Sequence, residues 1–354
     1  MTAVPAFGGD SYGHMSEPRP TVVHVEVVGL RDGSLAVSWE LAGEGPVEVA
    51  VGLRPDATDQ DPALRVEGTT HLTLRPLRPG RHYVSVAPVG GGPAVVAAER
   101  MVSLERGRNF RDLGGYHTAG GGRVRWGLVF RSASLHRLTA ADLITLDRLG
   151  LRVVYDLRGD EERERAPSVL PDGVRCELLP IGGTAAKTKE LTDLVLAGRL
   201  AELPLDFLVR IYDAMVEVAA GTFGRLLTRL AEPDGRPALF HCHAGKDRTG
   251  IVAALLLSLL GVDERTVLDD YQLSGIHYTE HQLAAVQAKL AGTGVDVERY
   301  RAVFGAPRHA MATVLAGLRQ RHGSLEAYLH DEAGVDHEVF AELRAALVQP
   351  AGRW

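Results

Sequence analysis

The chain has 354 residues, of which 45% are hydrophobic and 24% charged, and its formal net charge is -6. These values are typical of a soluble globular protein with room for two domains, and the negative charge argues against a general nucleic-acid or membrane-surface binder. The two cysteines, Cys176 and Cys242, are too few for a disulfide framework and favour a reducing, cytoplasmic compartment, with an unconventional route of export left open. No stretch is long and apolar enough to predict a membrane-spanning helix.

The N-terminal part of the chain divides into a tail and a small domain. Residues 1–20 contain glycine and proline but no apolar run, which predicts a flexible tail rather than a signal peptide. Residues 21–104 follow with short alternating runs, in one of which Leu35, Val37 and Trp39 share a strand face. Such runs, separated by glycine and proline turns, predict an antiparallel β-sandwich. It has no catalytic cluster, so we expect a spacer, or a module that binds a protein partner and is dispensable for chemistry.

The second domain, residues 105–354, opens with a polar segment that ends in two glycines. This pattern predicts a structured loop, which is either a turn held by side chains or part of a ligand pocket. Two strands are predicted downstream at 128–132 and 151–158, each with an arginine near its carboxyl end, where side chains of parallel strands tend to face a ligand crevice. The predicted substrate-pocket residues are therefore Asn109, Arg111, Asp112, Arg131 and Arg158.

Helical patterns surround these strands. Thr139 is the predicted N-cap of an amphipathic helix that Gly150 closes. One long amphipathic helix is predicted over residues 205–230, and residues 161–165 are expected to form a solvated charge run. Cys176 lies in a predicted strand, where a packing role is expected.

Residues 241–250 read His-Cys-His-Ala-Gly-Lys-Asp-Arg-Thr-Gly and lie between a predicted buried strand, 237–240, and a predicted buried helix, 251–260. A strand-to-helix loop points its backbone N–H groups and the positive end of the helix dipole at one spot. We therefore expect an anion to bind there.

Five residues separate Cys242 from Arg248, so that a curled loop brings the sulfur and the guanidinium to the same anion. Arginine binds phosphate oxygens two at a time, and the surrounding positive charge is expected to lower the thiol pKa and make Cys242 a nucleophilic thiolate. Thr249 is expected to hydrogen-bond the sulfur and help to expel it. The predicted phosphate-binding residues are His243, Ala244, Gly245, Lys246, Thr249 and Gly250.

This loop resembles the signature loop of cysteine-dependent protein tyrosine and dual-specificity phosphatases. With residues 109–115, 130–132 and 156–158, it makes the chain from about 107 to 348 similar to atypical bacterial tyrosine phosphatases related to mycobacterial protein tyrosine phosphatase B. The resemblance implies an α/β cysteine-phosphatase fold with a mixed central sheet flanked by helices. Some members carry a helical lid, and residues 185–206 are either a lid or a surface helix. Residues 77–83 resemble the tyrosine corner of fibronectin type III domains.

The resemblance implies hydrolysis of phosphotyrosine through a phosphocysteine intermediate, without metal or cofactor, and with phosphoserine, phosphothreonine and phosphoinositides as further substrates. In the mycobacterial relative the proposed acid is an aspartate that follows a Leu-Pro pair. The matching residues 179–183 contain no carboxylate, so Asp247 is the expected substitute. Asp193, Asp206 and Asp213 are weaker candidates. Lys246 adds a charge that favours inositol lipids. The alternative is a phosphate-binding pseudophosphatase or adaptor.

Overall fold

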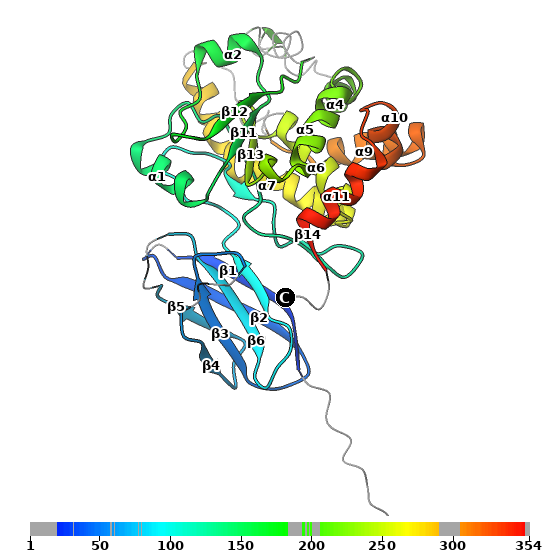
Figure 1. The fold of residues 1–354 in the computed structure, drawn as a ribbon. Coiled ribbons are helices and arrows are strands. Elements are labelled where there is room, and N and C mark those ends of the chain that lie inside the picture. Colours follow the sequence, from blue (N-terminus) through cyan, green and yellow to red (C-terminus); the bar gives the residue numbers. More distant parts are fainter. Residues whose placement is uncertain are drawn as a thin grey trace, which may run out of the picture.

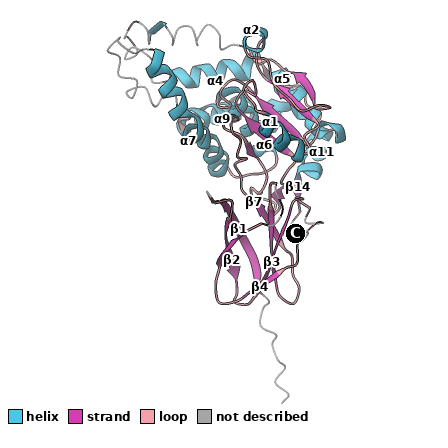
Figure 2. Ribbon diagram, turned by 90° about the vertical axis from the view of Figure 1, so that its left-hand side faces the viewer, coloured by secondary structure: helices cyan, strands magenta, loops and turns pink. Residues whose placement is uncertain are grey.

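The computed structural model describes residues 20–350, except for residues 31, 57, 58, 60, 77 and 79, most of 183–205, and 290–304. The predicted tail and most of the segment 185–206 lie outside the described residues. A β-sandwich lies below a larger α/β domain, and the two views in Figures 1 and 2 agree on this arrangement.

The N-terminal domain is built from two antiparallel sheets. One has the order β1-β2-β5, with β1 (Thr21–Gly29), β2 (Leu35–Ala42) and β5 (His71–Leu74). The other has the order β4-β3-β6-β7, with β4 (Leu64–Val66), β3 (Val47–Gly52), β6 (Tyr83–Pro88) and β7 (Val95–Ala98). Alternation places one face of each sheet in a shared core, which includes Val37, Trp39, Val84 and Val86. The predicted sandwich is confirmed.

The C-terminal domain has a five-stranded sheet of order β12-β11-β13-β10-β8. Four strands are parallel, namely β10 (Val129–Ser132), β11 (Val153–Asp156), β12 (Arg175–Leu178) and β13 (Ala238–His241), while β8 (Arg111–Asp112) runs antiparallel to β10. A separate two-stranded sheet pairs β9 (Arg123–Val124) with β14 (Val348–Gln349). The predicted mixed sheet is confirmed, and it places β13 at the centre.

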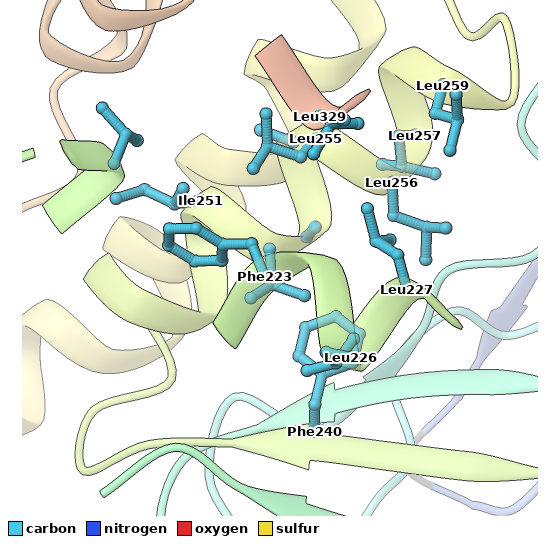
Figure 3. Packing of buried hydrophobic residues seen from close by; sticks show 14 of the residues in the cluster. Phe223, Leu226, Leu227, Phe240, Ile251, Leu255, Leu256, Leu257, Leu259 and Leu329 are labelled. Carbon is cyan, nitrogen blue, oxygen red and sulfur yellow. The ribbon is translucent and has the colours of Figure 1, made fainter. Parts of the chain in front are cut away.

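Helices cover both faces of this sheet because successive residues of its buried strands point to opposite sides. Phe130, Val154 and Leu239 belong to the cluster that includes Leu146 of α1 (Ala140–Arg148). On the other face, Phe240 packs near residues of α5 (Ala220–Ala231), α6 (Asp247–Leu259) and α10 (Leu325–Asp331), as Figure 3 shows. The same layer includes α4 (Phe207–Val218), α7 (Glu264–Lys289), α9 (Arg308–His322) and α11 (His337–Leu347). In the described part of the chain, none of these helices has the length and apolarity to cross a membrane.

Local details confirm some predictions and correct others. Thr139 caps α1 through a capping box with Asp142, as its position predicted. The single helix predicted over 205–230 is wrong, because the chain breaks between α4 and α5 at Ala219. Gly224 in α5 approaches the turn after α10 so closely that an added Cβ would lie 1.9 Å from the carbonyl oxygen of Ala333. Cys176 is exposed on β12, so the expected packing role is also wrong.

The two domains share polar contacts that are buried. Arg81 of the sandwich donates to the Asp112 carboxylate at 2.6 Å, with the two side chains 10% and 0% exposed. The indole of Trp126 donates to the carbonyl of Val96 at 3.0 Å. Arg100 donates to the carbonyls of Asp112 and Gly114 at 3.0 and 2.7 Å. The domains therefore form a continuous structure at this interface.

Candidate active site

The signature loop, residues 241–250, starts at the carboxyl end of the central strand β13 and runs into the first turn of α6. Gly245 holds a positive φ of 67°. An added Cβ there would lie 2.3 Å from the carbonyl oxygen of Ser132 at the end of β10, so only glycine fits. The loop is therefore wedged against the ends of the parallel strands, where open α/β sheets bind ligands.

Three successive carbonyls of the loop point outward to donors elsewhere in the domain. The backbone N–H of Ser134 donates to the carbonyl of His243 at 3.0 Å. The Asn109 amide donates to the carbonyls of Ala244 and Gly245 at 3.2 and 2.9 Å. In a trans peptide the C=O and the next N–H point in opposite directions. The N–H groups of Ala244, Gly245 and Lys246 are therefore directed to the other side of the loop, where the sequence predicts that an anion binds.

A buried ionic network supports these outward carbonyls. Arg131 donates to the carbonyl of Gly245 at 2.8 Å and to the Asp270 carboxylate at 2.6 Å. Arg111 donates to Asp270 at 3.0 Å, and its guanidinium also donates to the Asn109 side chain. Burial acts to raise the pKa of Asp270, but the two arginines hold it below its ordinary value. Burial and the neighbouring Arg111 lower the pKa of Arg131 to about 10.

These positions change the expected role of the predicted pocket residues. Arg111, Asp112, Arg131 and Arg158 are 0–1% exposed and bonded within the protein, and Asn109 is 2% exposed with a φ of +54°. We therefore propose that they hold the site rather than touch substrate. Asp112 also accepts from the N–H of Gly114, which is the side-chain-held turn that the sequence left open as an alternative.

Cys242 is the first loop residue after β13 and is 2% exposed. The preceding His241 is fully buried, and its Nδ1 lies 3.1 Å from the carbonyl oxygen of Cys242. Because a carbonyl only accepts, Nδ1 carries a proton. Burial lowers the pKa of His241 below its ordinary value, although Asp156 at 3.6 Å opposes this change. The Nδ1–H of His241 therefore donates to the carbonyl of Cys242 and orients the backbone next to the sulfur.

Arg248 is held by Glu162, a residue that the sequence analysis assigned to a solvated charge run. The two terminal nitrogens of Arg248 donate to the two carboxylate oxygens of Glu162 at 2.6 and 2.7 Å. Burial opposes the charge on Arg248, but Glu162 and Cys242 raise the guanidinium pKa above its ordinary value. Glu162 belongs to α2 (Asp160–Arg165) and also accepts from the N–H of Gly159 at 3.1 Å. The capping-box spacing at Gly159 was the signal that could have found it.

Asp247, the predicted acid, is oriented by a chain of buried hydroxyls. Tyr212 of α4 donates to its Oδ1, and the Tyr271 hydroxyl of α7 lies 2.6 Å from that of Tyr212. Lys246 Nζ is 3.5 Å from the same Oδ1. Because the Tyr212 proton goes to Asp247, Tyr271 donates to Tyr212. Of the weaker candidates, Asp206 pairs with Arg210 and Asp213 with Arg321, while Asp193 is one of the few described residues of its segment.

Residues 102–349 match the tyrosine phosphatase family. The chain belongs to this family. Triple specificity protein phosphatase PtpB of Mycobacterium tuberculosis is 32% identical over 276 residues, which cover 68% of this chain and 96% of that protein. A tyrosine-protein phosphatase of Nostoc commune is 32% identical over 228 residues, which cover 62% of this chain and 74% of that protein. Among solved structures, P. aeruginosa TpbA is 18% identical and covers 64% of this chain and 89% of its own, with a TM-score of 0.28, from which we draw no conclusion.

The family match and the similar tyrosine-protein phosphatases support a cysteine-dependent protein-tyrosine phosphatase. One predicted contact in the phosphatase is not formed. The Thr249 hydroxyl is fully buried and has no hydrogen-bond partner in the described part of the chain, so it does not bond the Cys242 sulfur in this structure. The predicted role of Thr249 in expelling the sulfur stays a prediction.

Proposed function

We propose that Cys242 attacks the phosphorus of a phosphate monoester whose oxygens are held by Arg248 and by the N–H groups of Ala244, Gly245 and Lys246. The S–P bond forms as the P–O bond to the leaving group breaks, and the leaving oxygen takes a proton. Water then attacks phosphorus, the S–P bond breaks and phosphate is released. The observation that carries this proposal is the outward direction of the loop carbonyls, which aims the amides at one anion above a buried cysteine.

The experiment for this proposal separates binding from turnover. Cys242→Ser should reduce hydrolysis of p-nitrophenyl phosphate to background, while phosphate-ester binding stays measurable by calorimetry because the amides and Arg248 remain. Hydrolysis that survives the substitution would remove Cys242 from the mechanism.

Asp247 is the proposed proton donor in the first step and the base that activates water in the second. Tyr212 and Lys246 both contact Oδ1, so Oδ2 is the oxygen that we assign to the proton transfer. The alternative is that Asp247 only orients the loop. A general acid matters most for poor leaving groups, whereas a distorted loop affects every substrate.

Asp247→Asn tests this assignment, because the amide keeps the size of the side chain and can still accept from Tyr212. We expect turnover of phosphoserine to fall roughly 100-fold or more, and turnover of p-nitrophenyl phosphate by much less. An equal loss on the two substrates would leave Asp247 as a structural residue and direct the search to Asp193, Asp206 and Asp213.

The substrate range is proposed to extend from phosphotyrosine to phosphoserine, phosphothreonine and phosphoinositides. The mycobacterial relative is named a triple specificity phosphatase, and Lys246 brings a cation into the loop. Asp247 at 3.5 Å balances part of that charge. Lys246→Ala should therefore lower kcat/KM more on a phosphoinositide than on a phosphotyrosine peptide. Equal losses would exclude a specificity role for Lys246.

A cytoplasmic location and a protein partner at the N-terminal sandwich belong to the same proposal. They rest on the cysteine usage and on the absence of a catalytic cluster in the sequence of that domain. Fractionation of cells and a pull-down with the sandwich surface altered would test them.

A further inference from the structure

A large cleft of about 990 Å³ lies between the sandwich and the catalytic domain. Its volume is in the range of small-ligand sites, which is roughly 300–1,000 Å³. The sandwich contributes the loop around Arg54 and the side of β6 and β7 that faces away from the sandwich core, including Ser85 and Val96. The catalytic domain contributes the loop around Trp126 and the residues that follow α1.

This cleft is at the opposite end of the sheet from the signature loop. Its lining includes Leu128, Arg152 and Pro237, which directly precede the parallel strands β10, β11 and β13. The signature loop follows β13 at its other end. About four residues of strand, or roughly 13 Å, therefore separate the two places. In Figure 1 the sandwich lies below the sheet and α2, which carries the partner of Arg248, lies above it.

The charge of the cleft is strongly positive in a chain whose net charge is -6. Among the described residues that line the cleft Asp56 is the one carboxylate, and it pairs with Arg54 at 3.0 Å. Arg81 pairs with Asp112, which is not among the lining residues. Three of the lining arginines, Arg125, Arg148 and Arg152, make no ion pair within the described residues. Six arginines line the cleft: Arg54, Arg81, Arg123, Arg125, Arg148 and Arg152.

Three further observations concern polar groups of the cleft lining. Arg81 is 10% exposed, and its Nε is buried without a hydrogen-bond partner in the described part of the chain, although its other nitrogens are bonded. Burial lowers the pKa of Arg123 to about 10, so the protein keeps this cation at a cost that an anion nearby would reduce. Ser85 is a polar residue between Val84 and Val86, which face the sandwich core, and it lines the cleft instead.

We propose that this interdomain cleft binds a small anion with several phosphate groups, separately from the catalytic loop. Arginine forks match phosphate oxygens, and low-dielectric walls that carry one sign of charge concentrate counter-ions. A cleft of this volume suits a small ligand rather than a macromolecule. Because both domains supply arginines, the bound anion bridges them and stabilises their association.

The test counts binding sites for inorganic tripolyphosphate by calorimetry in the Cys242→Ser protein, which does not turn over. Two sites are expected, one in the signature loop and one in the cleft. In the same background, Arg148→Glu with Arg152→Glu should remove one site or weaken it about tenfold or more. Both arginines are exposed, so the fold should persist, and Arg148→Gln with Arg152→Gln is the milder second variant. A matched control, Arg65→Glu with Arg225→Glu, reverses two exposed charges elsewhere and should keep both sites.

Inhibition kinetics identify which site is which. Tripolyphosphate should compete with p-nitrophenyl phosphate, and the inhibition constant should be the same with and without the two cleft substitutions. A single competitive site that the cleft substitutions leave intact overturns the proposal. An equal weakening in the control pair would also overturn it, by marking an adventitious ion only. If the loop were not a phosphate site, the calorimetric count would be one with no competition, so failure of the proposed function gives a different result.

Discussion

Asn109 supports the geometry of the signature loop. Replacing its side chain should lower the catalytic rate more than the accompanying loss of stability explains. In Asn109→Ala the carbonyl of Ala244 loses the donor at 3.2 Å, while the carbonyl of Gly245 keeps Arg131 at 2.8 Å. A buried carbonyl without a donor costs about 1–3 kcal/mol. An alanine held at a φ of +54° raises the cost to the folded state by about 1 kcal/mol more, since asparagine tolerates the left-handed region better than alanine does. The free energy of unfolding should therefore fall by about 2–4 kcal/mol.

The activity should fall by more than this loss of stability explains. Without its donor, the peptide between Ala244 and Gly245 is no longer held, and the N–H of Gly245 is no longer fixed on the anion. Loss of one such donor typically lowers kcat about 10²–10³-fold. Asn109→Gly removes the same amide donor, but glycine adopts a positive φ without a cost. This variant should be about 1 kcal/mol more stable than Asn109→Ala and should have a similar kcat.

The assay is kcat on p-nitrophenyl phosphate at a temperature where urea unfolding shows every variant to be folded. Leu343→Ala, a core substitution in α11, is the stability-matched control and should keep wild-type kcat. A kcat of Asn109→Ala within about threefold of wild type would refute the argument that the outward carbonyls set the amides.

Two further predictions concern the ion pairs. Glu162→Gln removes the negative charge and one of the two oxygens that hold the terminal nitrogens of Arg248, so kcat/KM should fall roughly tenfold; unchanged kinetics would mean that Arg248 needs no support. The Arg248 pair holds the pKa of Glu162 below its ordinary value of 4.5 against the effect of burial, so its stabilisation is present above about pH 4.5 and is lost as the pH falls through the folded pKa. Urea unfolding between about pH 3 and 6 should therefore be less acid-sensitive in Glu162→Gln than in wild type. Arg81→Met leaves Asp112 buried without its cation and should cost about 3–5 kcal/mol of unfolding free energy; a loss below about 1 kcal/mol would contradict this role.

The signature loop could be predicted from the sequence because its chemistry is local. The strand before it, the helix after it and the spacing of Cys242 and Arg248 all lie within about twenty residues. Because the loop follows β13 in the chain, the predicted ligand crevice lies at the carboxyl end of that strand. The mixed sheet and the sandwich follow from periodicity and turn residues in the same way.

The supporting residues could not be placed from the sequence, because they act across the fold. Glu162 lies 86 residues before Arg248, and Asp270 lies 159 residues after Arg111. Nothing in the charge pattern around Glu162 distinguishes a partly buried acceptor from a solvated one. The sequence analysis identified the arginines at the strand ends. Whether such a side chain contacts a ligand or instead binds the surrounding protein depends on its burial, which the sequence does not show.

The strand β8 connects the N-terminal domain to the catalytic loop, although it is two residues long. Neighbouring residues of a strand point to opposite sides, so Asp112 meets Arg81 of the sandwich while Arg111 meets Asp270 on the side of the loop. Asp270 in turn binds Arg131, which holds the carbonyl of Gly245. A shift of Asp112 must therefore move Arg111 as well, because the two share one stretch of backbone. That the sandwich is dispensable for chemistry stays a prediction, while these contacts connect the sandwich to the residues that hold the signature loop.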